Sequence, residues 1–327
     1  VDIASNDGCL IESFQAHGAN VLGIDPAKNL VEIANNRGLN SIDRFWNIET
    51  ANDVVAKFGM AKVITATNVL AHVANLHDFV GAVKILLQDD GLFIVEVPYL
   101  VNFINKKEFD TVYHEHLSYF LLKPLKLLFR KHDMIILDIQ QSVIHGGTIR
   151  VFVGKASNNN ERTSREVTSA EWLIDLENDL GLHDLSRYKE FQADVGSLKH
   201  EIVSLLKNLK KNNKTIAAYG ASAKGCVLMN FCNIGRETIE YIVDDTPEKL
   251  HKLTPGALIP IVGKEALRDN KPDYLLLLAW NFTDVLTWLL TDIFFHKIHM
   301  FLSLLIIQGS EFELVSCHLK SICRSNS

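Results

Sequence analysis

The first half of the chain alternates between short apolar runs and amphipathic stretches. VDIAS at residues 1–5 predicts a strand, LIESFQAH at 10–17 a helix, and NVLGID at 20–25 a second strand. AKVITATNVL at 61–70 is a near-continuous apolar run, as is typical of a parallel strand buried on both faces. LFIVEVP at 92–98 predicts another strand. Repeated strand–helix–strand units predict an α/β fold with a doubly wound parallel sheet.

Two further patterns complete this half. PAKNLVEIANNRG at 26–38 predicts a helix with Pro26 in its first turn, and LHDFVGAVKILLQDDG at 76–91 predicts a helix that closes at Gly91. MIILDIQ at 134–140 and GTIRVFVG at 147–154 predict two strands that pair as an antiparallel edge.

The second half begins with a polar linker and two helical stretches, after which a new α/β pattern runs from TIAAYG at 215–220 to DYLLLLAW at 273–280. The tail is strongly apolar, but Asp292, Lys297 and two histidines interrupt it, so we expect a buried or misfitting segment and no membrane span. The predicted organisation is a first α/β domain, a helical connector, a second smaller α/β domain and a divergent apolar tail, at residues 1–155, 156–212, 213–282 and 283–327.

Composition narrows the function. The chain has 327 residues, of which 47% are hydrophobic, and a net charge of -6, which speaks against broad nucleic-acid binding. Its five cysteines form no CxxC pair, and this suits a reducing compartment, so we expect a cytoplasmic protein. The chain opens inside a predicted strand without an initiator Met, which predicts a piece of a longer protein.

The loop ASNDGCL follows the first predicted strand, where ligands bind in open α/β sheets. Gly8 lets a ligand approach the backbone, and the next helix offers free N–H groups. Asp25 ends the second strand, where a carboxylate can accept both hydroxyl hydrogens of a ribose. The fingerprint G-x-G-x-x-G is absent, which favours S-adenosylmethionine over NAD. The alternative is an ordinary turn and an ordinary surface carboxylate.

The stretch DTVYHEHLSYF at 110–120 concentrates further polar chemistry. His114 and His116 share a face if the segment is extended, so they could bind a metal together with His72 or His145. A histidine with an ordinary pKa of about 6.5 could instead act as a general base. A polar lid without chemistry is the third possibility, and spacing does not separate a lid from a base.

Several motifs together resemble the sugar C-methyltransferase family, whose members methylate a ring carbon of nucleotide-linked keto-deoxysugars. These motifs are DIASNDGCL, VLGIDPAKN, NVLAHVANLHDFV, EVPYL, DTVYHEHLSYF, HGGTIRVF, AYGASAKG, YIVDDTPEKLHKLTPGALIPI and LLLLAWN, and they cover residues 1 to about 282 in the family's order. The resemblance implies a class I methyltransferase fold, with a Rossmann-like doubly wound sheet and a second, smaller Rossmann-like domain. It also implies S-adenosylmethionine as cofactor and a nucleotide-diphosphate sugar as substrate.

The resemblance also implies roles for single residues. His116 looks like the general base, with Tyr113, Glu115 and His72 as further active-site residues. The implied cofactor contacts are Ser5, Asn6, Gly8, Asp25 and Asn68. The implied substrate contacts are His145, Gly146, Tyr219 and Lys224. Carbon is a poor nucleophile until it loses a proton, so a base beside an activated C–H group makes chemical sense, and this route needs no metal.

Some features depart from the family pattern. Family members carry an N-terminal zinc-binding domain with a cysteine cluster, so zinc is expected only in that domain, which this sequence does not contain. After AWNF the resemblance ends. The alternatives are therefore a non-catalytic remnant that keeps nucleotide binding and an NAD-dependent oxidoreductase. In the second domain, Asp244 could contact a ribose, or AYGASAKG could be a purely structural turn.

Overall fold

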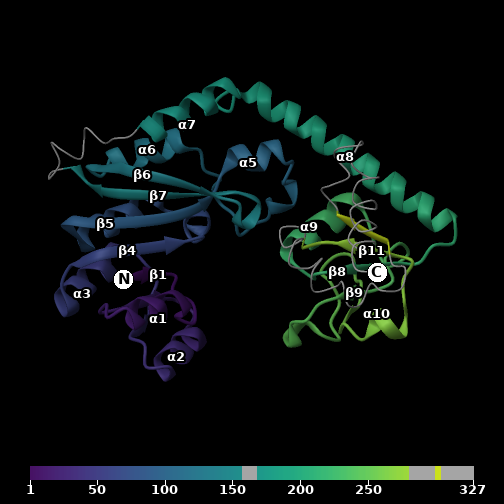
Figure 1. The fold of residues 1–327 in the computed structure, drawn as a ribbon, viewed down its shortest axis with the longest axis horizontal. Helices are drawn as coiled ribbons and strands as arrows, with labels where there is room; N and C mark the ends of the chain where they lie inside the picture. The colour runs from purple at the N-terminus through teal and green to yellow at the C-terminus, as the bar shows by residue number, and fades with distance from the viewer. Residues whose placement is uncertain (157–167, 280–298, 303–327) are drawn as a thin grey trace, which may run out of the picture. The chain divides into compact units, whose positions relative to one another are not determined.

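The computed structural model describes residues 1–156, 168–279 and 299–302 (Figure 1). Contacts divide the chain into two compact units, the first comprising Val1–Phe103 with His114–Asp184 and the second Ile104–Tyr113 with Leu185–Ser327. This division differs from the sequence-based boundaries in two ways. Residues 104–113 belong to the second unit, and the predicted helical connector is shared between the two.

A seven-stranded sheet forms the centre of the first unit, in the order β3-β2-β1-β4-β5-β7-β6. Its strands are β1 (Asp2–Ile3), β2 (Gly23–Asp25), β3 (Ser41–Asp43), β4 (Ala61–Thr67), β5 (Leu87–Pro98), β6 (Met134–Ser142) and β7 (Thr148–Lys155). The first five are parallel, whereas β7 is antiparallel to both β5 and β6. The predicted α/β class, the doubly wound sheet and the antiparallel edge are confirmed.

Helices connect the strands of the first unit along the chain and pack around the sheet (Figure 1). They are α1 (Cys9–Ala16), α2 (Lys28–Asn36), α3 (Ile48–Phe58), α4 (Leu76–Leu86), α5 (Leu100–Asn105), which runs into the second unit, α6 (Leu122–Arg130) and α7 (Thr168–Asp179). The predicted helix at 76–91 is wrong at its end, because Leu87 already pairs with Ala61 of β4 and the chain there has become a strand.

Gly8 fixes where α1 begins. It is the N-cap residue of α1 in the left-handed region, at φ 86°. A Cβ atom at this position would lie 2.5 Å from Leu39 Cδ1 and 3.2 Å from Ala34 Cβ, so the missing side chain makes room for the packing of α2. The glycine is thus required by backbone conformation and packing, besides any ligand.

We therefore expect Gly8→Ala to destabilise the first unit by about 2 to 4 kcal/mol, from the left-handed backbone and the clash with Leu39. Gly18→Ala is the matched control, since Gly18 has φ 82° and nothing lies within 4 Å of its Cβ position. Urea unfolding of both variants should give a cost of about 1 to 2 kcal/mol for Gly18→Ala, from the backbone alone. Equal costs for the two would contradict the packing role.

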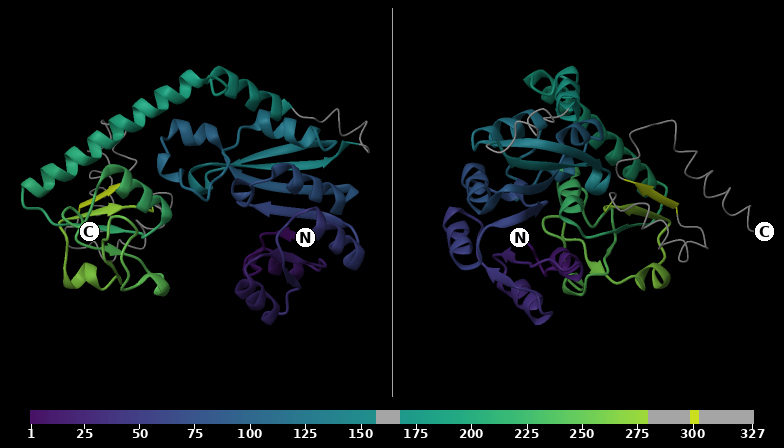
Figure 2. Two further views of the ribbon diagram at one scale, coloured as in Figure 1. Left: turned by 180° about the vertical axis from the view of Figure 1, so that it is seen from behind. Right: turned by 60° about the vertical axis from the view of Figure 1, so that its left-hand side comes forward.

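The second unit contains a five-stranded parallel sheet in the order β10-β9-β8-β11-β12. Figure 2 shows this unit in green to yellow from two further sides. Its elements are β8 (Ile216–Tyr219), β9 (Ile242–Val243), β10 (Ile261–Val262), β11 (Tyr274–Leu277) and β12 (His299–Leu302), with α8 (Leu185–Lys211), α9 (Ala223–Cys232) and α10 (Ala266–Asp269). Apolar residues three and four apart on α8 are buried in the core of this unit, namely Val195, Leu198, Ile202, Leu206 and Leu209.

The apolar tail predicted at 283–327 lies outside the described residues except for β12, whose backbone pairs in parallel with β11. Within residues 1–156, 168–279 and 299–302, no helix combines the length and the apolar character needed to cross a membrane.

Candidate functional site

The carboxyl ends of β1, β2, β4 and β5 meet at one edge of the first sheet. From β1 the chain winds outward through β2 to β3, whereas β4 lies on the other side of β1. This reversal between β1 and β4 is a topological switch point, where open α/β sheets bind ligands. The loop after β1, the end of β2 and the loop after β4 all gather there.

Asp25 organises the β1 end of this edge. Its side chain is 7% exposed, and its two oxygens accept hydrogen bonds from the backbone N–H groups of Asn6, at 2.9 Å, and Ala27, at 2.8 Å. Asn6 has a positive φ of 56°, which helps its N–H group to reach the carboxylate. One carboxylate therefore holds the loop after β1 against the turn after β2 and keeps further lone pairs for a ligand.

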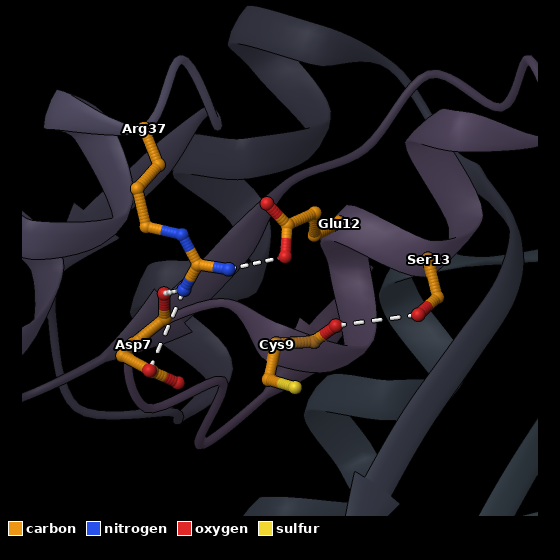
Figure 3. A network of polar contacts seen from close by, with 5 residues as sticks. All are labelled: Asp7, Cys9, Glu12, Ser13 and Arg37. Atoms are coloured by element: carbon orange, nitrogen blue, oxygen red, sulfur yellow. Dashed lines mark hydrogen bonds and ion pairs between the residues drawn. The ribbon is translucent and has the colours of Figure 1, made fainter.

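Arg37 holds the same loop from the other side (Figure 3). This residue is the C-cap of α2, and its Nη1 donates to the Asp7 carbonyl at 3.0 Å, while its Nη2 pairs with the Glu12 carboxylate of α1. Figure 3 also shows the Ser13 hydroxyl on the Cys9 carbonyl, a bond within α1. The loop is thus tied to both neighbouring helices before any ligand binds.

Ser5 and Gly8, both predicted to contact the cofactor, also have packing contacts within the protein. The Ser5 hydroxyl is buried over Gly23, since a Cβ atom on Gly23 would lie 2.5 Å from Oγ of both Ser5 and Ser41. The space beside Gly8 is taken by Leu39. A ligand at this loop would therefore meet mainly backbone groups and the exposed Asn6.

Asn68 follows β4 at the other side of the switch point. It adopts the left-handed region at φ 55°, and its N–H donates to the Glu96 carbonyl at the end of β5, at 2.9 Å. Its side-chain Oδ1 is buried and accepts no hydrogen bond from any described residue. A buried acceptor without a donor is costly, so its presence at a ligand edge points to a donor that arrives with a ligand.

Two buried acids at this edge were not among the sequence-based candidates. Burial raises the pKa of Asp2 in β1 to about 6, although the Thr65 hydroxyl donates to it at 2.6 Å. Glu96 in β5 is 3% exposed and accepts Nε and Nη2 of Arg150 in β7, at 3.0 and 2.7 Å. The available signal was an acidic residue inside each of two apolar strand patterns.

His72 and His116 come together at the 3₁₀ turn that follows Asn68 in the chain. The Ala71 carbonyl accepts the N–H groups of Leu117 and Ser118, at 2.8 and 3.2 Å, and this docks the YHEH segment onto the 3₁₀ turn Leu70–His72 after β4. The two imidazole rings lie edge to face with their centroids 4.9 Å apart. His116 is half-buried.

The neighbours of His116 fall into different positions. His114 and Glu115 are exposed, whereas the ring of Tyr119, which the sequence did not single out, lies 6.3 Å from that of His116 and 5.4 Å from that of Phe103. Tyr113 belongs to the second unit. Sequence spacing did not show which of His114 and His116 contacts His72, because the two residues share a face if the segment is extended.

The HGG loop closes the β5 side of this edge. The Gly147 carbonyl accepts the Tyr99 N–H at 3.0 Å, and a Cβ atom on Gly147 would clash with the Asn102 side chain. Gly146 is buried at φ 96° in the 3₁₀ turn Ile144–Gly146. The side chain of His145 is outside the part of the structure that is described.

Residues 104–113 lead into the histidine segment and carry a buried acid. Phe109 packs in the core of the second unit, with its ring 5.0 Å from that of Phe231 in α9. Beside it, Glu108 is 4% exposed. Burial raises the pKa of Glu108 to about 7. The charge of Asp110 also raises this pKa, whereas the charges of Lys224 and Lys106 lower it.

A folded-state pKa above the usual 4.5 means that Glu108 stabilises the fold below about pH 4.5 and that this contribution is lost as the pH rises through 7. When the pH rises from about 5 to about 8.5, the parent should therefore lose on the order of 2 kcal/mol more unfolding free energy than Glu108→Gln. Urea unfolding at both values measures this, with Glu201→Gln on the exposed face of α8 as control. Parallel pH profiles of parent and Glu108→Gln would refute it.

The second unit repeats the carboxylate device of the first. Asp244 follows β9 and accepts the N–H groups of Ala221, at 2.8 Å, and Thr246, at 2.9 Å. Asp244 also accepts a hydrogen bond from Lys249 Nζ at 3.1 Å. Burial opposes its ionisation, but these bonds outweigh burial and lower the pKa of Asp244. Unlike Asp25, this carboxylate already has a cation, so it is less suited to a ribose.

Tyr219 and Lys224 flank the turn after β8. The Tyr219 hydroxyl donates to Asp245 at 2.7 Å, and burial together with this carboxylate raises its pKa. Lys224 lies in the first turn of α9, whose N-cap Ser222 accepts the Gly225 N–H. As for metals, the described residues contain no group of three or more His, Cys, Asp and Glu side chains placed to hold an ion.

Comparison with known proteins gives a consistent result along the chain. Residues 1–137 match the methyltransferase domain family, and residues 143–297 match the C-methyltransferase C-terminal domain. Over 282 residues the chain is 36% identical to the C-methyltransferase NovU of Streptomyces niveus, which covers 86% of this chain. Its first part thus belongs to the methyltransferase domain family and its second part to the C-methyltransferase C-terminal domain family. The chain spans 66% of the length of NovU.

Solved structures are similar to part of the chain. An S-adenosylmethionine-dependent methyltransferase from Anabaena variabilis shares 17% identity over 47% of this chain and 75% of its own, with a TM-score of 0.38. Another from Clostridium acetobutylicum shares 13% over 47% of this chain and 82% of its own, with a TM-score of 0.37. The class I methyltransferase fold expected for the first unit rests on its strand order and on the methyltransferase domain match.

Proposed function

We propose that the protein is an S-adenosylmethionine-dependent C-methyltransferase. In this proposal, it deprotonates a ring carbon next to the ketone of a nucleotide-diphosphate keto-deoxysugar and methylates it, with His116 as general base. The observation that carries the proposal is the ring contact of His72 and His116 on the loop after β4, the loop that also carries the buried, unpartnered Asn68 Oδ1. Its cysteine pattern suits work in the cytoplasm.

The residues at this edge fit the cofactor. Asp25 keeps lone pairs for ribose hydroxyls, the loop after β1 offers backbone groups, and Asn68 Oδ1 needs a donor such as an amino group. The two acids Asp2 and Asp25 favour a cationic ligand at this edge. When bound, the cofactor supplies an electrophilic methyl group on a sulfonium sulfur.

The histidine pair fits the proton transfer. A carbon next to a ketone loses its proton more readily, because the charge spreads onto the oxygen. His116 is half-buried and docked through the Ala71 carbonyl, so it can be held at one position to take that proton. His72, with Glu115 and Tyr113 as further candidates, would orient His116 or donate to the enolate oxygen.

Substrate contacts are proposed for each unit separately. In the first unit, His145 and Gly146 of the HGG loop are candidates for the sugar. In the second, Lys224 is a candidate for the diphosphate, as a point charge in the first turn of α9, and Tyr219 for the nucleotide.

Calorimetric titration with S-adenosylmethionine, and with NAD in parallel, tests the cofactor assignment. We expect micromolar affinity for S-adenosylmethionine and none for NAD, followed by methyl transfer to a keto-deoxysugar nucleotide in a turnover assay. A folded sample that binds NAD alone would make the protein an oxidoreductase. A folded sample that binds neither would make it a non-catalytic remnant.

A further inference from the structure

Glu177 is a carboxylate in the interior of the first unit. It lies in α7, far along the chain from the histidine segment, and its side chain is 0% exposed. Burying a carboxylate is costly unless several donors satisfy it. The hydrogen bonds that Glu177 accepts therefore show which groups offset the cost of its burial.

These bonds converge on the start of α6 and on Tyr99. Oε1 accepts the Tyr99 hydroxyl at 3.0 Å and the Leu122 N–H at 2.5 Å, and Oε2 accepts the Lys123 N–H at 3.2 Å. Nε2 of His183 lies 3.6 Å from Oε2. The N-cap residue of α6, Leu121, makes no side-chain cap, so Glu177 supplies that cap from another helix.

Tyr99 connects this carboxylate to the edge that carries the histidines. It is 1% exposed, and burial together with Glu177 raises its pKa. Its N–H donates to the Gly147 carbonyl, and its backbone bridges to Phe120, whose carbonyl accepts the Leu100 N–H at 3.0 Å. Tyr99 thus joins the end of β5, the HGG loop and the end of the histidine segment.

Residues 114–121 are consequently fixed at two places. The Ala71 carbonyl holds Leu117 and Ser118 next to His116, and the contacts of Phe120 and of the α6 start hold the other end. Glu177 is bonded to both partners of that second anchor, Tyr99 and the first turn of α6. We infer that Glu177 is a positioning residue, which holds the 114–121 segment so that His116 stays beside His72.

This inference rests on the proposed role of His116, and it is tested by Glu177→Gln. The variant keeps the shape but places an amide N–H₂ group among N–H and O–H donors. Backbone hydrogen exchange of peptides covering 114–123 should speed up about tenfold or more, the equivalent of one lost charge-assisted hydrogen bond. Glu171→Gln, on the exposed surface of the same helix, is the matched control.

Kinetics give the second readout, with a thymidine-diphosphate keto-deoxysugar as probe. Displacement of His116 should lower kcat about ten- to hundredfold and leave the Kd for S-adenosylmethionine unchanged. An unchanged kcat, or a kcat loss accompanied by an equal loss of cofactor affinity, would overturn the positioning role. Failure of the proposed function looks different, because exchange in 114–123 would still respond to Glu177→Gln while His116→Ala would have no effect on turnover.

Tyr99→Phe serves if Glu177→Gln does not fold. It removes one donor to Glu177 and keeps the ring in its buried place. We expect a two- to tenfold lower kcat (about the net worth of one hydrogen bond), again with unchanged cofactor affinity. Parent-like kcat and parent-like exchange in 114–123 would overturn the inference.

Discussion

His116→Ala is expected to lower kcat by about 10²- to 10⁴-fold, the usual contribution of a positioned general base. The Kd for S-adenosylmethionine should stay at the parent value, because the proposed cofactor contacts lie on the loops after β1, β2 and β4. The cause is the loss of proton removal from the carbon next to the ketone. Exchange of that proton with deuterated solvent, in the presence of S-adenosylhomocysteine, isolates this step from methyl transfer.

His114→Ala is the matched control for this experiment. His114 lies in the same segment but is exposed, whereas the ring that packs against His72 is that of His116. We expect parent-like solvent exchange and parent-like kcat. If His116→Ala exchanges and methylates at the parent rate, His116 is not the base. His72→Ala then distinguishes the two imidazoles, since this substitution should abolish solvent exchange of the substrate proton only if His72 takes that proton.

Asp25→Ala is expected to weaken S-adenosylmethionine binding by about 10²-fold or more, since hydrogen bonds to a charged group are each worth about 1.5 to 3 kcal/mol. It also leaves the N–H groups of Asn6 and Ala27 without their acceptor. The loop after β1 should therefore loosen as well, and calorimetric titration together with hydrogen exchange of residues 4–9 would report both effects.

Asp43→Ala is the control for this change. Asp43 ends β3 and pairs in register with Asp25, but it is exposed. Its removal should leave cofactor affinity and loop exchange at the parent values. Parent-like affinity in Asp25→Ala would exclude Asp25 as the ribose contact, and a looser loop with parent-like affinity would leave it a structural role only.

The sequence by itself determined the α/β class, the parallel direction of the buried strands and the antiparallel edge. Each of these depends on local periodicity and on apolar runs, which any correct fold of the chain must bury. It also placed Asp25 at a strand end, because an acidic residue that closes an apolar strand lies at the sheet edge. Asn68 was given only by the resemblance, because it falls inside the apolar run 61–70. The end of the helix before β5 was predicted wrongly, since the strand pairing of Leu87 is a non-local choice.

Only the tertiary structure decided which residues meet. That His116, and not His114, lies against His72 depends on the Ala71 carbonyl, which local spacing does not encode. That Gly8 is required by Leu39, and that Asp244 is already paired with Lys249, follows likewise from residues distant in sequence. The same is true of Glu177, which looks like any surface acid of an amphipathic helix until its fold buries it among three donors. Periodicity fixes which face is buried, whereas hydrogen-bond partners depend on long-range packing, and the chemistry of this protein depends on the latter.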